Sequence, residues 1–241
     1  MQTSLYVSLS AQMALRKRMD TIAYNVANMN TVGYRASEVK FEALVEKAGS
    51  NNVAYSSAGT DFISTRSGGA VKTDNPLDVA IQGDSWFAIK TPGGTTYTRD
   101  GRLTLTETGT LQNLDGNPIL DVGGTPIVLD PTAGAPKIAS DGMITQDGNH
   151  VGAIGLFQID PSAKLSRSNF GGLVPSKPAT PVLDFSSNGV AQGFVENSNV
   201  NPVMEMSKLV QVSRAFDNVS NMIQSSETSL TDAIKTLGGA S

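Results

Sequence analysis

The stretch LYVSLSAQMALRKRMDTIAYNVANM, residues 5–29, decides how the fold begins. Alternating steps of three and four residues from Leu5 reach eight positions, six of them apolar, and no Pro or Gly interrupts the stretch. This spacing predicts a helix with one apolar stripe, as in a coiled coil. Gly33 then favours a helix end, because glycine enters the left-handed region without steric cost. The six apolar positions are Leu5, Leu15, Met19, Ile22, Val26 and Met29.

A second helical stripe follows the helix breaker Pro202. Its polar positions Ser213, Ser220 and Glu227 recur every seven residues. A partly apolar stripe makes a poor isolated coiled coil and suits a helix with several neighbours in an assembly. We therefore expect both stripes to form an assembly interface, with a simple core face as the alternative. The apolar positions of the second stripe are Met206, Leu209, Phe216, Ile223, Leu230, Ile234 and Leu237.

Between the helices the pattern changes to the period of two that is typical of strands. Leu77, Val79 and Ile81 alternate with residues that are small or polar, which predicts a half-buried strand. Asp-Gly pairs at 100–101, 115–116, 141–142 and 147–148 favour tight hairpin turns. The stretch 49–61 has no periodicity and indicates a linker or an extended arm. We expect residues from about 71 to 184 to fold alone.

These patterns predict an α+β fold that is mainly β. The N- and C-terminal helices pair in a coiled-coil-like layer, and short hairpins build a central antiparallel β domain. The expected division assigns residues 1–34 to the N-terminal helix, 35–70 to a linker or extended arm and 71–190 to the β domain. Residues 191–202 form a connector, and residues 203–241 form the C-terminal helix.

The composition excludes most catalytic chemistry. The 241 residues include no cysteine, which removes disulfides, thiolate metal sites and cysteine nucleophiles. The single histidine, His150, follows a predicted turn and is expected to be exposed. No nucleophile-elbow or phosphate-loop motif is present, and the Asp115-Gly116 region fits a hairpin better than a calcium loop. We expect no enzyme, cofactor, metal or small-molecule substrate, although a secreted β-rich enzyme is the competing class.

Charge and hydropathy limit the partners further. The net charge of −4 argues against a nucleic-acid binder, which usually carries a basic patch. Residues 1–40 carry five basic and two acidic groups, whereas residues 191–241 carry three basic and five acidic groups. These opposite charges suit pairing of the two ends with each other or with copies. No apolar run is long enough for a membrane-spanning helix. The basic residues 16–18 follow the first apolar residues, so we expect no cleaved signal peptide.

Separate motifs along the chain resemble those of a known family. The first are LYVSLSA at residues 5–11 and NVANMNTVGYR at residues 25–35, and the last is QGFVENSNVNPVMEM at residues 192–206. Between them, PLDVAIQGDSWF at residues 76–87 and YTRDG at residues 97–101 look like a shared β domain. In this order the motifs resemble those of bacterial flagellar rod and hook proteins. The motif positions are Asn25, Asn28, Thr31, Gly33, Tyr34, Gln192, Gly193, Asn199, Asn201 and Pro202.

The stretch between Tyr34 and Ala70 is compact, which resembles the proximal-rod members of this family. Distal-rod members typically carry extra sequence there, and a distal-rod or hook-type axial protein is the alternative. Val32 and Trp86 are mild departures from the residues common at these positions.

The resemblance implies a structural, non-enzymatic subunit of the flagellar basal-body rod that polymerises through its terminal helices and is needed for motility. It implies export by the flagellar type III apparatus without a cleaved signal peptide. The expected location is the rod within the periplasm. The expected partners are other rod subunits and copies of this chain in a helical array.

Overall fold

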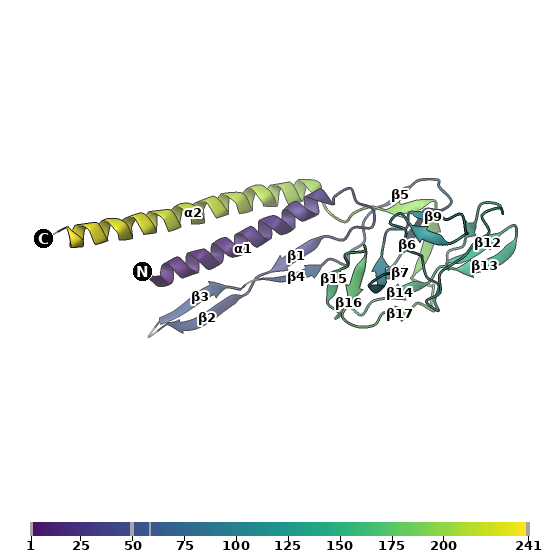
Figure 1. The fold of residues 1–241 in the computed structure, drawn as a ribbon, viewed down its shortest axis with the longest axis horizontal. Helices are drawn as coiled ribbons and strands as arrows, with labels where there is room; N and C mark the ends of the chain where they lie inside the picture. Colours follow the sequence, from purple (N-terminus) through teal and green to yellow (C-terminus); the bar gives the residue numbers. More distant parts are fainter. Residues whose placement is uncertain (1, 49–50, 58, 240–241) are drawn as a thin grey trace. The chain divides into compact units, whose positions relative to one another are not determined.

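The computed structural model describes residues 2–48, 51–57 and 59–239 and shows a mainly β protein with a helix at each end (Figure 1). The chain divides into two compact units. The helical unit comprises Met1–Ala27, Ser37–Phe62 and Asn201–Ser241, and the β unit comprises Asn28–Ala36 and Ile63–Val200. The helical ends and the central antiparallel β domain confirm the predicted fold class.

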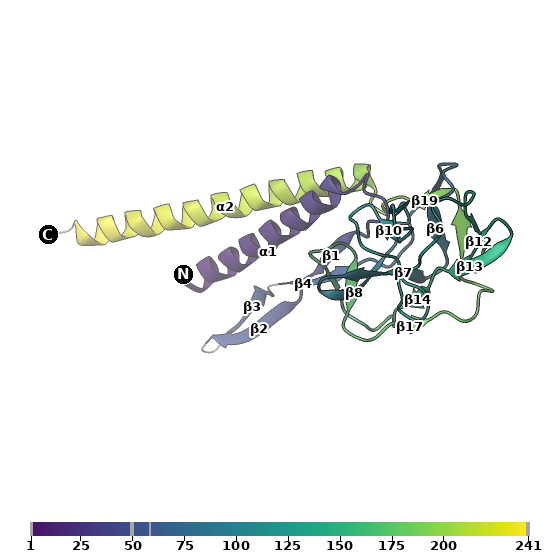
Figure 2. The same cartoon turned by 45° about the vertical axis from the view of Figure 1, so that its right-hand side comes forward.

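The helical unit contains two long helices and an antiparallel ribbon. The helices are α1 (Gln2–Ala27) and α2 (Pro202–Gly238), which pack along one another (Figures 1 and 2). In the ribbon, β1 (Ser37–Lys40) pairs with β4 (Thr60–Ile63), and β2 (Ala43–Ala48) pairs with β3 (Asn51–Ser56). Strands β1 and β3 pack against α1.

The ribbon occupies most of the stretch for which the sequence predicted a linker or an extended arm. Its strands are short, and in β1 only Ser37 and Val39 are turned inward, which gives too few alternating positions for a strand signal. Lys17 holds the ribbon to α1: its Nζ donates to the carbonyl oxygen of Gly59 over 3.0 Å and lies 3.1 Å from a carboxylate oxygen of Asp61. A two-stranded ribbon is marginal alone, so this support from α1 stabilises it.

The β unit is built from short antiparallel strands. Its largest sheet has six strands in the order β15-β16-β8-β7-β14-β17, and a separate three-stranded sheet has the order β11-β12-β13. Strand β18 pairs with β6, β19 with β5, and β10 with β9. The strands are β5 (Ala70–Lys72), β6 (Val79–Gln82), β7 (Ser85–Thr91), β8 (Gly94–Thr98), β9 (Leu103–Leu105), β10 (Leu111–Asn113), β11 (Lys137–Ile138), β12 (Met143–Gln146), β13 (Asn149–Ala153), β14 (Leu156–Gln158), β15 (Leu165–Arg167), β16 (Leu173–Pro175), β17 (Thr180–Pro181), β18 (Gly189–Gln192) and β19 (Phe194–Glu196).

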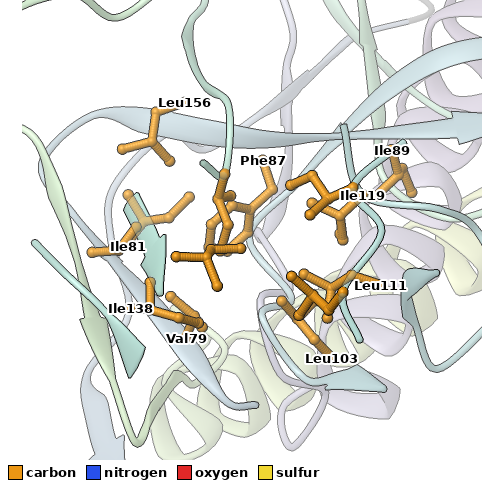
Figure 3. Packing of buried hydrophobic residues seen from close by; sticks show 14 of the residues in the cluster. Val79, Ile81, Phe87, Ile89, Leu103, Leu111, Ile119, Ile138 and Leu156 are labelled. Carbon is orange, nitrogen blue, oxygen red and sulfur yellow. The ribbon is translucent and has the colours of Figure 1, made fainter. Parts of the chain in front are cut away.

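The β unit contains a hydrophobic core of fifteen buried residues (Figure 3) and two smaller buried clusters. Strands β6 and β7 contribute Val79, Ile81, Phe87 and Ile89, all buried. The sequence predicted a half-buried strand here, but Ala80 is buried as well, so both faces of β6 are covered. Further buried members of this core are Leu103, Leu111, Ile119, Ile127, Leu129, Ile138, Ile144, Ile154, Leu156, Val182 and Val190.

The β unit continues past the segment that was expected to fold alone. Strand β18 places Val190 in the core, and the residues up to Val200 belong to the same unit. A fragment of residues 71–184 therefore lacks one core strand and the partner of β5. The apolar alternation that marks the middle of the unit is too short in β18 and β19 to mark its end.

We predict that a fragment of residues 28–200, which holds both segments of the β unit, unfolds cooperatively and shows a β-type circular dichroism spectrum. A fragment of residues 71–184 should have a free energy of unfolding lower by at least about 3 kcal/mol. It loses buried Val190 and leaves the guanidinium of Arg99 without the carboxylate of Glu196, a cost of about 3–5 kcal/mol. Urea titration of both fragments measures the difference; equal midpoints would exclude β18 and β19 from the cooperative core.

Candidate assembly surface

The terminal helices run antiparallel within the helical unit (Figure 1). Near the middle of α1, the amide Nε2 of Gln12 donates to the hydroxyl of Ser220 over 2.8 Å. Near the end of α1, the amide Nδ2 of Asn25 donates to a carboxylate oxygen of Glu205 over 3.3 Å. The two contacts fix the register of the pair along its length.

The expected stripe of α1 is mostly turned inward. Ile22 is buried, and Leu5, Leu15, Met19 and Val26 are half-buried. Met29 departs from the expectation, because α1 ends at Ala27 and Met29 packs against Tyr34, Ala36 and Val200 in the β unit.

The expected stripe of α2 is divided between covered and exposed positions. Its half-buried members are Leu209, Phe216, Ile223 and Leu230, whereas Met206, Ile234 and Leu237 are exposed. The buried residues of α2 are instead Glu205 and Val212, which the sequence analysis missed. Glu205 and Val212 lie on the same face as the half-buried members of the stripe, and the fixed alternation missed them because it stepped to Met206 and Ser213, one residue beyond each.

Large apolar side chains are exposed on both helices within the described chain. Where they follow one another at helical spacing, as Tyr6, Leu9 and Met13 do, they form stripes of the kind that marks interaction sites. On α1 the exposed apolar residues are Tyr6, Leu9, Met13 and Tyr24; on α2 they are Val203, Met204, Met206, Val210, Met222, Ile234 and Leu237.

Three motif residues position the ends of these helices. Asn25, which is buried, accepts a hydrogen bond from the backbone N–H of Ser37 over 2.9 Å and donates to its carbonyl oxygen over 2.8 Å. It thereby fixes the start of β1 against α1. Asn201 caps α2 by accepting a hydrogen bond from the N–H of Met204, and Pro202 occupies the first turn, where its missing N–H has no cost.

In the β unit, the N-terminal motif forms a tight turn. The N–H of Thr31 donates to the carbonyl oxygen of Asn28 over 3.1 Å. Gly33 has a φ of +69°, and a Cβ there would lie 2.3 Å from the backbone nitrogen of Asp100. Only glycine fits this conformation and this approach. Tyr34 follows the turn, and the guanidinium of Arg167 lies 4.4 Å from the centroid of its ring.

The amide side chains of the C-terminal motif join separate segments of the β unit. Asn199 accepts a hydrogen bond from the N–H of Ala36 over 2.7 Å and donates to the carbonyl oxygen of Arg66 over 2.8 Å. Gln192 accepts from the N–H of Ile138 over 3.1 Å and donates to two proline carbonyl oxygens, each 2.7 Å away. The side-chain amide of Gln192 thus makes three hydrogen bonds to backbone groups of separate segments.

Gly193 connects β18 to β19 with a φ of +79°. Its N–H donates to the carbonyl oxygen of Asp78 over 2.7 Å, and its own carbonyl oxygen accepts from the N–H of Thr73 over 2.8 Å. The positive φ favours glycine at this position.

A buried charge cluster lies beside these motifs and was not among the predicted site residues. Glu196 accepts from Arg35 over 2.5 Å and from Arg99 over 2.9 Å, and all three side chains are buried. The guanidinium carbons of Arg35 and Arg99 lie 5.4 and 5.1 Å from the ring centroid of Trp86, which favours cation–π attraction. The N–H of Gly68 also donates to Glu196.

Burial is the main influence on the charge of both arginines. It lowers the pKa of Arg35 and lowers the pKa of Arg99 to about 10, while the nearby carboxylate of Glu196 opposes this shift. A pKa of about 10 leaves the guanidinium of Arg99 charged at neutral pH. The cluster ties together residues far apart in the sequence by charge-assisted hydrogen bonds, which are stronger than neutral ones.

Within the described residues, no group of three or more His, Asp or Glu side chains could hold a metal ion. No helix in the part of the chain that the structure describes is long and apolar enough to span a membrane. His150 lies on β13 and is exposed.

We predict that Glu196→Gln lowers the free energy of unfolding by about 3–5 kcal/mol, because it leaves two buried guanidiniums without a compensating carboxylate. Glu107→Gln is the matched control: Glu107 is exposed, and surface substitutions change stability by about 0.5 kcal/mol or less. Urea titration followed by tryptophan fluorescence measures both variants. If both variants lose the same amount of unfolding free energy, Glu196 does not stabilise the protein through this cluster.

Three family models match successive parts of the chain. Residues 5–35 match "Flagella basal body rod protein", residues 80–146 match "Flagellar hook protein FlgE/F/G D1 domain", and residues 191–236 match "Flagellar basal body rod FlgEFG protein C-terminal". They follow the order of the motifs described above.

Relatives match the chain along its full length. The chain is 52% identical to the flagellar basal-body rod protein FlgF of Mesorhizobium japonicum and 49% identical to FlgF of Rhizobium meliloti, with 100% of each chain covered. It is 30% identical to the flagellar basal-body rod protein FlgG of Bacillus subtilis, over 97% of this chain and 98% of the relative. The resemblance found in the sequence motifs is confirmed, and the chain belongs to the flagellar basal-body rod protein family.

Proposed function

We propose that this chain is a structural subunit of the proximal flagellar rod, without enzymatic activity, and that it polymerises through its terminal helices. The observation that carries this proposal is the apolar surface left uncovered on α1 and α2. A stable subunit that needed only its own two helices would cover this surface. A neighbouring subunit in a helical array can cover it instead. Such an array forms when a head-to-tail contact does not close into a ring, since each subunit then offers its free surface to the next one.

The partners we propose are copies of this chain and other rod subunits. Similarity to FlgF relatives at 52% and 49% identity supports a place in the proximal rod. The full-length similarity to a FlgG relative supports a distal-rod position as the second candidate. Labelling the chain in isolated basal bodies and locating it along the rod distinguishes these positions.

We further propose export through the flagellar type III apparatus, without a cleaved signal peptide, into a rod that lies in the periplasm. The absence of cysteine in the sequence is compatible with assembly in an oxidising compartment, because no thiol can form a wrong disulfide there. Detection of the full-length chain outside the cytoplasm, dependent on the export apparatus, tests this part of the proposal.

We predict that Leu230→Asp abolishes incorporation into the rod and swimming. Leu230 is half-buried on the face of α2 that packs on α1, so an unpartnered carboxylate there disturbs the helix pair that carries the proposed interface. Truncation of a buried leucine alone costs about 2–5 kcal/mol, and an array repeats the loss in every subunit. Basal-body composition and swimming zones measure the effect, while the thermal unfolding of the β unit should stay as in the unchanged protein.

The control for this variant is Thr228→Asp, two residues away on the exposed side of α2 and expected to swim normally. An export assay establishes that both variants leave the cytoplasm. Normal swimming by Leu230→Asp cells would contradict the proposed interface, and loss of β-unit unfolding would instead assign Leu230 to the subunit's own stability.

We also predict that His150→Ala leaves rod assembly and motility unchanged. His150 is exposed, and exposed substitutions change the free energy of unfolding by about 0.5 kcal/mol or less. Swimming zones and urea titration measure the outcome. Loss of motility in a folded and exported variant would give His150 a functional role that a purely structural subunit does not need.

A further inference from the structure

We propose that a shallow depression between loops of the β unit, here called the loop depression, binds an arginine side chain from α1 of a second copy of this chain. This inference rests on the proposed function, because it names one contact that joins two subunits in the rod. The residues that line the loop depression are Pro92, Asp115, Asn117, Asn169, Phe170 and Gly171.

Hydrogen bonds hold the walls of the loop depression in place. The side-chain oxygen of Asn113 accepts from the backbone N–H groups of Asp115 and Asn117 over 3.1 and 2.8 Å. The amide Nδ2 of Asn117 donates to the carbonyl oxygen of Phe170 over 3.2 Å. The N–H of Phe170 in turn donates to the hydroxyl of Ser168 over 3.1 Å. The turn that carries Asp115 and the loop that carries Phe170 are therefore tied together.

The loop depression contains a carboxylate without a paired cation. Asp115 is exposed and has no ion-pair partner among the described residues. It accepts a long hydrogen bond of 3.4 Å from the amide of Asn113. Gly171 lies beside it with a φ of +84°, and a Cβ there would lie 3.1 Å from a carboxylate oxygen. Glycine at this position thus leaves that oxygen open to a ligand.

An aromatic ring faces the same space. The side chain of Phe170 is 45% exposed. Gly93, in the turn between β7 and β8, lies next to the ring, and a Cβ there would lie 3.5 Å from two ring carbons. Because Gly93 has no side chain, it does not cover the ring. A cation in the loop depression therefore meets an aromatic ring and a carboxylate together.

The chemistry of the lining favours a cation with several N–H groups. The carboxylate of Asp115 only accepts hydrogen bonds, and the side-chain oxygens of Asn117 and Asn169 accept as well. No basic side chain is among the described residues that line the loop depression. A guanidinium suits this lining better than an ammonium, because it stacks on an aromatic ring while its N–H groups reach several acceptors.

The arginines in the same region are engaged elsewhere. Arg102 donates to both carboxylate oxygens of Asp100, over 2.9 and 2.6 Å. Arg167 lies over the ring of Tyr34, 4.4 Å from its centroid. The two arginines of the buried charge cluster hold their own carboxylate. A cation for Asp115 must therefore come from another part of the chain or from another copy.

Charge complementarity favours the N-terminal segment of a second copy. Residues 41–190 carry ten basic and fifteen acidic groups, whereas residues 1–40 carry five basic and two acidic groups. Between copies, these opposite net charges attract the N-terminal segment of one copy to the β unit of another.

The ion pairs of residues 1–40 leave two candidate arginines. Lys17, Arg35 and Lys40 each have a carboxylate partner. Arg16 and Arg18 are exposed on α1, and neither has an ion-pair partner among the described residues. These two guanidiniums are therefore available to the loop depression of a second copy.

The contact is small and depends on repetition. An arginine seated in a pocket is a frequent hot spot of protein interfaces. One side chain nevertheless buries far less than the roughly 1,200 Å² that a stable pair of proteins needs. We therefore expect a monomer in dilute solution and the contact only in the assembled rod. Because the donor on α1 and the acceptor on the β unit differ, each copy can use one of each, and the array stays open.

An exchange of charges in cells tests the contact. Asp115→Arg should reduce incorporation into the rod at least tenfold, because it places one guanidinium against another. Its combination with Arg16→Asp or with Arg18→Asp should restore most of the incorporation in at least one of the two pairs. Glu107→Arg is the matched control, since Glu107 is an exposed acid of the β unit outside the loop depression, and it should change incorporation less than twofold.

Cysteine cross-linking in assembled rods identifies the partner, and the sequence contains no native cysteine to interfere. Asn169→Cys marks the loop depression, and Asp20→Cys marks the exposed part of α1 near Arg16 and Arg18, so both arginines are kept. Mild oxidation of rods that carry both cysteines in the same chain should give a ladder of disulfide-linked multimers. Glu107→Cys in place of Asn169→Cys should give at least tenfold less product.

A binding experiment with the purified full chain does not depend on the rod. N-acetyl-arginine amide should shift the side-chain amide resonances of Asn117 and Asn169 to saturation, and Asp115→Asn should reduce the shift at least fivefold. N-acetyl-glutamine amide and maltose are the matched probes and should leave the resonances unchanged. This experiment also decides the matter if Asp115→Arg fails to fold in urea titration.

The inference is overturned if neither charge exchange restores incorporation, if Glu107→Arg is as harmful as Asp115→Arg, or if the cross-linked partner is a different rod protein. It is also overturned if the arginine probe shifts the two resonances no more than the glutamine probe or maltose does. Absence of the unchanged chain from isolated rods is a different result. It refutes the proposed function, whereas selective binding of the arginine probe in solution would still establish the site.

Discussion

The β unit depends on one carboxylate, that of Glu196, held between two buried guanidiniums. Its oxygens bind Arg35 from the N-terminal motif, Arg99 from the loop after β8 and the backbone N–H of Gly68. Any arrangement that separates these segments leaves a charge buried and uncompensated, which is far more costly than losing a surface ion pair. The cluster therefore selects one way of bringing together the beginning and the end of the β unit.

The sequence alone predicted both helices, the pairing between them and the central antiparallel strands, because each depends on local periodicity. It missed two positions on the inner face of α2. Val212 and Glu205 are buried there, and a fixed step from Met206 cannot choose between adjacent positions of a helix. Packing against α1 determines which positions of α2 are buried. The contact of Glu205 with Asn25 is polar, so a search for apolar periodicity cannot detect it.

The ribbon and the charge cluster were missed for related reasons. The ribbon strands are short and are stabilised by packing against α1, so their own sequence shows only a weak strand periodicity. Arginine and glutamate are expected on surfaces, and nothing local marks Arg35, Arg99 and Glu196 as buried. The motif positions were found by resemblance, whereas their physical roles became visible only in three dimensions: Gln192 bridges backbone segments, and Gly33 permits a close approach to Asp100.

The position of Trp86 has a consequence for spectroscopy. It is the single tryptophan of the sequence, it is buried, and its ring lies against both guanidiniums of the charge cluster. Its emission therefore reports the β unit alone, while the helical ellipticity arises from α1 and α2, outside that unit. The two signals separate the melting of the terminal helices from the melting of the β unit in an unlabelled protein.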